Sequence, residues 1–168
     1  MKKTILFLPF LFAPSLFING DYLLAEIKAY DQQRFTIVTS ELLKQLKESA
    51  KIMLKNRTET IRILEKSYMA QLHNPQTQNP HRVIDNAINA TSLQRDLFAI
   101  ELALLKKEAF DAFQTHMKNT SLVPETTINQ FYRKIRTISQ TNMQEIKNYG
   151  ETAIISLSTA LTLLSNKQ

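Results

Sequence analysis

Histidine is the residue type that most often serves metal binding and base catalysis near neutral pH, and the chain has three. His73 and His81 flank a segment with two prolines, and His116 closes a later helical pattern. By helical rise, His116 lies roughly 50 Å from the other two, so the three side chains do not converge on one ion. The acids nearest to the pair, Glu65 and Asp85, lie one to two helical turns away. We therefore expect no metal site and no cofactor.

Glu101 and Glu108 are the carboxylates closest to an acid–base pair, because positions seven residues apart share one helical face. Lys106, Lys107 and Asp111 surround them, and a charged, solvated outer face accounts for the same pattern. The sequence lacks cysteine, the Ser-x-x-Lys and Gly-x-Ser-x-Gly elements of nucleophilic enzymes, and glycine-rich phosphate loops. We predict no catalytic residues and a protein that is not an enzyme.

The composition favours helices over strands. The 168 residues include two glycines, five prolines and 43% hydrophobic residues. Tight hairpins and phosphate loops need residues that tolerate positive φ, so scarce glycine argues against an all-β or Rossmann-type fold. The length is that of one domain with a core of its own.

The first twenty residues have the pattern of a secretory signal peptide. Lys2 and Lys3 precede an uncharged, apolar run over residues 5–18, and the small residue Gly20 follows. We expect residues 1–20 to be removed, which places the protein in the periplasm or outside the cell, because the pattern is typical of Gram-negative export. Removal leaves 21 − 2 = 19 Lys and Arg against 15 Asp and Glu, a net charge of +4.

A retained membrane anchor is the alternative for the same segment. The apolar run is shorter than the roughly 20 residues that a spanning helix needs. Pro9 and Pro14 interrupt it as well. Cleavage is therefore the preferred interpretation.

The remaining glycine and prolines divide residues 21–168 into three segments. Apolar residues recur at steps of three, four, seven or eight in each, which predicts helices at about residues 22–72, 83–118 and 124–165. Short connectors make neighbouring helices antiparallel. We therefore predict an all-α fold with a single domain, an elongated antiparallel three-helix bundle with coiled-coil-like packing.

The first predicted helix is longer than its partners, since the three would measure about 75, 54 and 61 Å. Part of residues 22–38 must then overhang the bundle, fold back as a separate helix or pack on another subunit. Residues 35–39, Phe-Thr-Ile-Val-Thr, are rich in β-branched side chains and mark the expected break. The residues assigned to partner binding in this segment are Tyr22, Leu23, Ile27, Phe35 and Val38.

Residues 152–164 contain no charged side chain, and their apolar arc is wider than one seam requires. Three kinds of contact could cover this arc: residues 68–72 and 84–88 of the same chain, a subunit interface, or a membrane surface. Intervening Ser and Thr allow close helix approach and favour protein contact over lipid. The residues assigned to partner binding here are Ile155, Leu157, Leu161, Leu163 and Leu164.

A basic face follows the first helix, at Lys44, Lys47, Lys51 and Lys55. Acidic residues are interleaved with it, and an exported protein rarely meets DNA, so we expect no nucleic acid partner. The face is suited to keeping the helix in solution or to binding an anionic partner or a membrane surface.

Two functions fit these features. The first is a non-enzymatic exported protein that acts through protein contacts, including contacts with its own copies, as a small subunit of an envelope or secretion assembly. The second is a chaperone-like holdase or membrane-surface binder, which would hold acidic or unfolded clients through the basic face.

Overall fold

The computed structural model describes residues 20–118 and 123–166, with side chains from Leu24 onward. Within these ranges the chain forms three helices and no strand: α1 (Gly20–Leu72), α2 (Pro80–Met117) and α3 (Glu125–Ser165). The all-α fold is confirmed. The predicted signal peptide lies outside the described residues except for Gly20.

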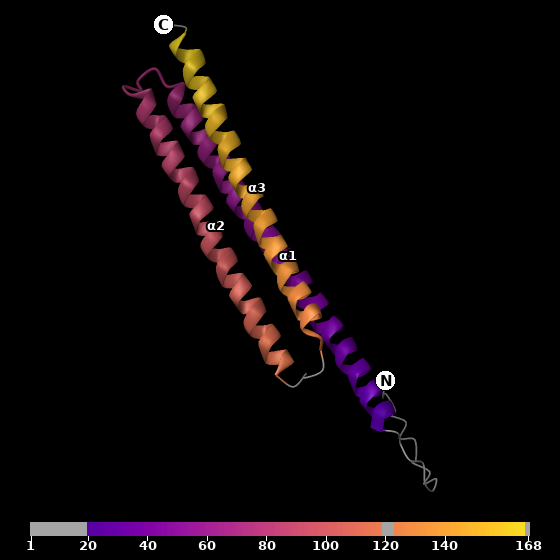
Figure 1. Cartoon of the computed structure of the whole chain (residues 1–168). Coiled ribbons are helices and arrows are strands. Elements are labelled where there is room, and N and C mark those ends of the chain that lie inside the picture. The colour runs from indigo at the N-terminus through magenta and orange to yellow at the C-terminus, as the bar shows by residue number, and fades with distance from the viewer. Residues whose placement is uncertain (1–19, 119–122, 167–168) are drawn as a thin grey trace, which may run out of the picture.

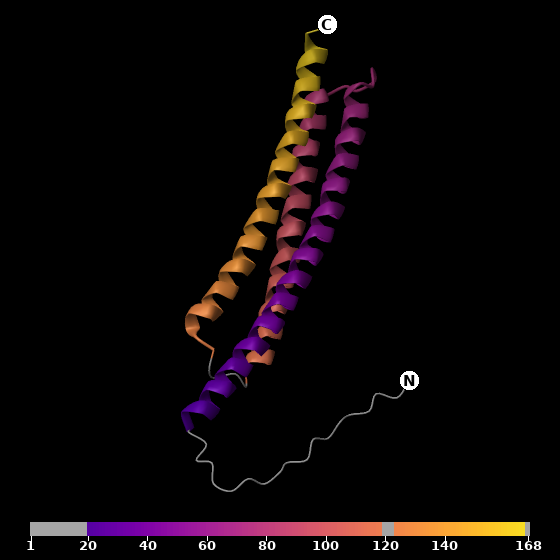
Figure 2. The same cartoon turned by 90° about the vertical axis from the view of Figure 1, so that its right-hand side faces the viewer.

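The three helices lie side by side, and each packs against both others. Figure 1 shows that α1 and α3 run in the same direction and α2 in the opposite one. The N-terminal part of α1 continues past the connector between α2 and α3, as Figure 2 also shows after a quarter turn. This part of the chain therefore overhangs the bundle and does not fold back as a separate helix, and its packing on another subunit stays a prediction.

Local hydrogen bonds set the boundary between α1 and α2. The side chain of Asn79 accepts a hydrogen bond from the backbone N–H of Arg82 at 3.1 Å, and Pro80 occupies the first helical turn. The hydroxyl of Thr77 donates to the carbonyl oxygen of Gln71 at 2.6 Å, which holds the connector against the end of α1. Because Asn79 caps it, α2 begins three residues before the expected position, about residue 83.

The break predicted at residues 35–39 is wrong, because α1 is continuous there. The hydroxyl of Thr36 donates to the carbonyl oxygen of Gln32 at 2.9 Å, and that of Thr39 to Phe35 at 2.8 Å. Each bond returns a polar side chain to the preceding turn of the same helix. Phe35 and Thr39 are also buried against the bundle, and this tertiary contact overrides the weak helix propensity of the segment.

The buried residues recur every eleven residues along all three helices. An eleven-residue repeat corresponds to about 3.67 residues per turn, which is typical of a right-handed supercoil, whereas a seven-residue repeat gives a left-handed one. A straight line of buried side chains therefore runs nearly parallel to each helix axis. The three clearest lines are Thr39, Ala50, Ile61 and Leu72 in α1, Ala87, Phe98 and Ala109 in α2, and Ile135, Ile146 and Leu157 in α3.

An aromatic cluster forms the core at the end where α2 meets α3. The ring centroids of Phe113 and Phe131 lie 4.5 Å apart and stack, and Phe35 meets Phe113 edge-on at 5.9 Å. Such pairs contribute about 0.5–1.5 kcal/mol beyond their buried area. The cluster fixes α1 to the other two helices just before α1 leaves the bundle.

Gly150 of α3 lies close against Thr91 of α2. It is buried in the middle of α3, and a Cβ atom placed there would lie 2.9 Å from Cγ2 of Thr91. That distance is shorter than van der Waals contact. Thr91 is buried and β-branched, so its methyl group has little freedom to turn away.

We expect Gly150→Ala to destabilise the bundle, although alanine is favoured over glycine in helices by about 1 kcal/mol. Forcing a methyl group into this contact costs about 1–3 kcal/mol, so the free energy of unfolding should fall by about 1 kcal/mol. Urea unfolding followed by circular dichroism measures it. In a Thr91→Ser background, which removes Cγ2, the same change should become neutral or stabilising, and an equal loss in both backgrounds would contradict the contact.

Candidate functional site

The overhang of α1 exposes three large apolar side chains, and one of them, Leu24, continues a line of buried residues. Leu24 lies eleven residues before Phe35, which lies eleven before Leu46, and the last two are buried. Leu24 and Ile27 are 45% and 44% exposed because α2 and α3 have ended before this level. Tyr30 is exposed too. The overhang is thus a length of core-forming helix without its neighbours.

The residues assigned to partner binding in residues 22–38 have different fates. The side chains of Tyr22 and Leu23 lie outside the described residues, and Ile27 is exposed. Val38 is half-buried. Phe35 is 4% exposed and packs edge-on against Phe113. It therefore belongs to the core of its own chain, which corrects its assignment to partner binding.

The uncharged C-terminal segment is covered mainly by its own chain. Leu157 is 1% exposed and packs in one cluster with Leu72, Val83 and Ala87. Its assignment to partner binding is wrong, because α1 and α2 already bury it. Half-buried residues at the edge of this cluster include Leu161 and Leu164.

Two residues of the same segment face solvent. Ile155 is 65% exposed and Leu163 is 59% exposed. They lie eight residues apart on the outer side of α3, among serines and threonines. Single exposed apolar side chains are ordinary on protein surfaces.

The predicted basic face is fully on the surface. All of its members are exposed, and within the described ranges none forms an ion pair. Lys51 and Lys55 border a shallow pocket of about 340 Å³ between α1 and α3, whose lining includes Ile52 and Glu145. The face consists of Lys44, Lys47, Lys51 and Lys55.

The predictions from the sequence missed an apolar stripe on the surface of α2. Its four members follow one another at steps of four, three and four residues, and the second member, Leu97, is half-buried. These positions share one side of a helix, away from the buried line through Phe98. The signal was present, because α2 has more apolar residues than one buried face can hold. The exposed members are Leu93, Ile100 and Leu104.

Glu101 belongs to an interhelical ion pair and not to a solvated outer face. Arg57 of α1 donates from Nε to Oε2 of Glu101 at 3.2 Å and from Nη2 to Oε1 of the same carboxylate. Its Nη1 donates to Oε1 of Gln94 at 2.9 Å. The hydrogen bond to Glu101 raises the pKa of Arg57, against the opposing effect of partial burial. This bidentate contact ties α1 to α2 at mid-length.

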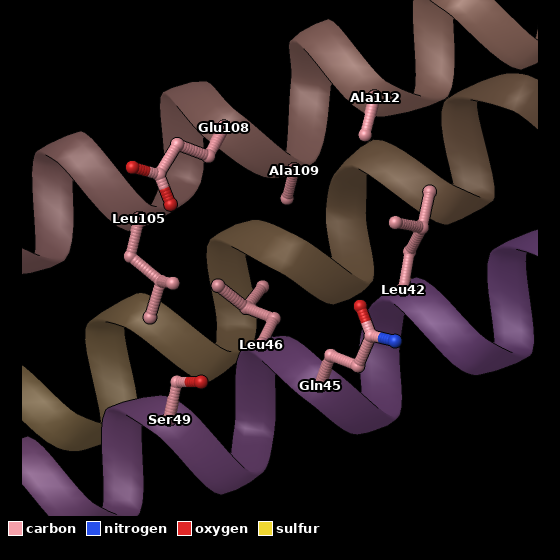
Figure 3. A pocket seen from close by; sticks show the side chains of 8 residues that line it. All are labelled: Leu42, Gln45, Leu46, Ser49, Leu105, Glu108, Ala109 and Ala112. Atoms are coloured by element: carbon pink, nitrogen blue, oxygen red, sulfur yellow. The ribbon is translucent and has the colours of Figure 1, made fainter.

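Glu108 lies apart from that pair, in a groove of about 280 Å³ between α1 and α2 (Figure 3). Figure 3 shows the lining side chains arriving from these two helices. The small side chains of Ala109 and Ala112 leave the space open, and Leu46 and Leu105 border it. Glu108 is its one titratable lining residue, so the groove does not combine the two carboxylates considered for acid–base chemistry.

The histidines are exposed where the sequence places them, at the ends of helices. Nδ1 of His73 lies 2.8 Å from the carbonyl oxygen of Met69. Among the described residues, no three His, Asp or Glu side chains lie close enough to hold a metal ion. In the same part of the chain, no helix has the length and apolar character to cross a bilayer.

A charge should destabilise the protein strongly on the buried side of the C-terminal segment and only weakly on its exposed side. Leu157→Asp should lower the free energy of unfolding by about 3 kcal/mol or more, because it removes a buried side chain and buries an unpaired carboxylate. The matched change Ile155→Asp, two residues away and exposed, should cost about 1 kcal/mol at most. Urea titration of both variants measures this, and equal losses would mean that Leu157 is not buried by its own chain.

Comparison with protein-family models, with curated proteins and with solved structures gives no match to this chain. Function has to be inferred from the chain's own surfaces. These are the exposed end of α1, the apolar stripe of α2 and the lysine face.

Proposed function

We propose that this protein is an exported, non-enzymatic helical protein that acts through protein contacts, as a small subunit of an envelope or secretion assembly. The observation that carries the proposal is the overhang of α1, where Leu24, Ile27 and Tyr30 are exposed. A partner that supplies helical surface there would extend the core that α2 and α3 supply further along.

The energetics of burial support this use of the overhang. Full burial of a leucine or isoleucine side chain is worth about 1.5–3 kcal/mol, so covering Leu24 and Ile27 favours association. The position of Leu24, eleven residues before the buried Phe35, matters as much as its exposure. A partner helix meets side chains already spaced for helix packing, without a change in the conformation of α1.

Export is the part of the proposal that depends on sequence alone. The lysines at the start, the apolar run over residues 5–18 and the exit at Gly20 support a signal peptide and a periplasmic or secreted protein. We extend the proposal to the packing, as a coiled-coil-like bundle in which the helices keep contact along their length. The eleven-residue spacing of the buried residues supports that continuous contact.

A second candidate function rests on the lysine face. Lys44, Lys47, Lys51 and Lys55 are exposed and form no ion pair within the described ranges, so their charges remain available to an anionic client or membrane surface. In this alternative the protein is a chaperone-like holdase or surface binder. Its action would weaken with added salt.

The overhang can be tested by placing charges on it. We expect a stoichiometric partner to co-purify with the protein from envelope extracts of its source cell, and a Leu24→Asp/Ile27→Asp variant to lose that partner, because it must bury two carboxylates at the contact. Quantitative mass spectrometry of the purified complex and light scattering measure the loss. If the partner is a second copy, the mass in solution falls to that of the monomer.

Ile63→Asp is the matched control, because Ile63 is also an exposed isoleucine of α1 but lies away from the overhang. It should keep the partner. Retention of the partner by the overhang variant would contradict the proposed contact. Suppression of aggregation of unrelated unfolded proteins, lost at high salt and in a Lys44→Gln/Lys47→Gln/Lys51→Gln/Lys55→Gln variant, would favour the holdase instead.

The export prediction has its own test. Expression of the full chain in a Gram-negative host should yield a periplasmic protein whose mass corresponds to residues 21–168. Leu8→Arg, which places a charge inside the apolar run, should block export and leave the unprocessed chain in the cytoplasm. Mass spectrometry of the cytoplasmic, periplasmic and membrane fractions measures the location and the processing of the chain. A full-length protein in the membrane fraction would indicate a retained anchor.

A further inference from the structure

A pocket of about 450 Å³ lies between α2 and α3, near the connector that joins them. It combines two aromatic rings with two cations and an amide, and no Asp or Glu lines it. Its lining residues are Lys106, Phe110, Gln114, Tyr132 and Arg136.

The register of the two helices places the cations opposite each other. The rings of Phe110 and Tyr132 meet edge-on with centroids 5.3 Å apart, which fixes these two residues at one level. Lys106 lies four residues before Phe110, and Arg136 lies four residues after Tyr132. Because α2 and α3 run in opposite directions, both cations lie one helical turn from the ring pair on the same side.

The charge of this pocket is not neutralised by the chain. Within the described ranges neither Lys106 nor Arg136 forms an ion pair. Lys106 is also the one lysine described there that is half-buried, while the others are exposed. Both cations line the same pocket, and no acidic side chain of the lining neutralises them, so an anion that enters meets positive charge from both helices.

We propose that this pocket binds a carboxylate from an acidic peptide segment of a protein partner. The carboxylate lies between Lys106 and the guanidinium of Arg136, whose planar fork suits bidentate binding. An apolar or aromatic side chain next to it in the partner packs on Phe110 and Tyr132. Gln114, one turn beyond the rings, offers an amide to the partner's backbone. The site names the partner chemistry of the proposed function and rests on it.

The charges around the pocket favour an acidic peptide over an anionic membrane. A membrane surface is bound by clusters of about four to eight Lys and Arg. Near it, Lys107 is paired with Asp111 at 3.4 Å, while Arg133 and Lys134 of α3 are exposed and form no ion pair within the described ranges. Neither Arg133 nor Lys134 lines the pocket, where two cations beside two aromatic rings match one discrete acidic group.

The test uses the purified protein and a synthetic peptide, acetyl-Ala-Glu-Phe-Glu-Ala-amide. We expect saturable binding by calorimetry, with NMR shifts of the Gln114 side-chain amide and the Arg136 Nε–H. Replacing both glutamates by glutamine should weaken binding at least about tenfold, since a charge-assisted hydrogen bond contributes about 1.5–3 kcal/mol. Lys106→Gln/Arg136→Gln should have an effect of the same size.

Two further variants distinguish binding in the pocket from a general attraction by the protein's positive charge. Lys134→Gln, an exposed lysine of α3 outside the pocket, should keep full affinity, and Arg136→Lys, which keeps the charge but loses the fork, should fall between wild type and the double variant. Equal binding of the glutamine peptide, or full affinity in the double variant with unchanged circular dichroism, would overturn the proposal. So would phosphatidylserine vesicles binding through Lys106 and Arg136 when the peptide does not bind.

The proposed function and this site can fail separately. Intact peptide binding, together with a co-purifying partner that the Leu24→Asp/Ile27→Asp variant retains, supports the site and contradicts the overhang contact. A co-purifying partner that is kept by Lys106→Gln/Arg136→Gln, together with absent peptide binding, contradicts the site alone.

Discussion

The eleven-residue recurrence of buried side chains is the constraint on which this structure depends. It holds the buried line of each helix nearly parallel to the helix axis, so three long helices keep contact without strong winding. Small buried residues let the helices approach closely, as at Gly150, where an added Cβ atom would lie 2.9 Å from Thr91. A second line in α1, through Leu46 and Phe35, reaches Leu24 at the same spacing, where α1 has passed the connector between α2 and α3. The exposed overhang is thus a consequence of the same pattern that builds the core.

The unequal helix lengths concentrate distinctive surfaces at one end of the molecule. The overhang of α1 and the basic pocket between α2 and α3 both lie toward the connector that joins α2 to α3. The aromatic cluster of Phe35, Phe113 and Phe131 lies between them and holds the three helices in fixed relation. A partner helix on the overhang would therefore approach an anion-binding pocket on a rigid neighbour. Apolar burial would supply most of the affinity, and the charges would set orientation.

The sequence predicted the three helices because few residues could interrupt them, but it placed the start of α2 three residues late, since Asn79 caps the helix at Pro80. It failed at residues 35–39, where β-branched composition suggested a break. Propensity is weaker than burial, and the hydroxyls of Thr36 and Thr39 return to the same helix. For the surfaces, the pattern identified the apolar positions of residues 152–164 but not which neighbour covers each. Leu157 and Ile155 differ only through the register of α1 and α2 against α3, and a single sequence does not contain that register.

The ion pairs also show what a single sequence predicts and what it does not. Pairs within a helix, such as Lys107 with Asp111, follow from spacing and are worth about 0.2–0.5 kcal/mol. The contact of Arg57 with Glu101 joins residues far apart in the chain, and only the packing of α1 on α2 produces it. Once such pairs are assigned, the cations without partners can be identified as candidates for binding an anion. Lys106 and Arg136 come from different helices and line one pocket that no acidic side chain of this chain lines, so their positive charges stay available to an anion from outside.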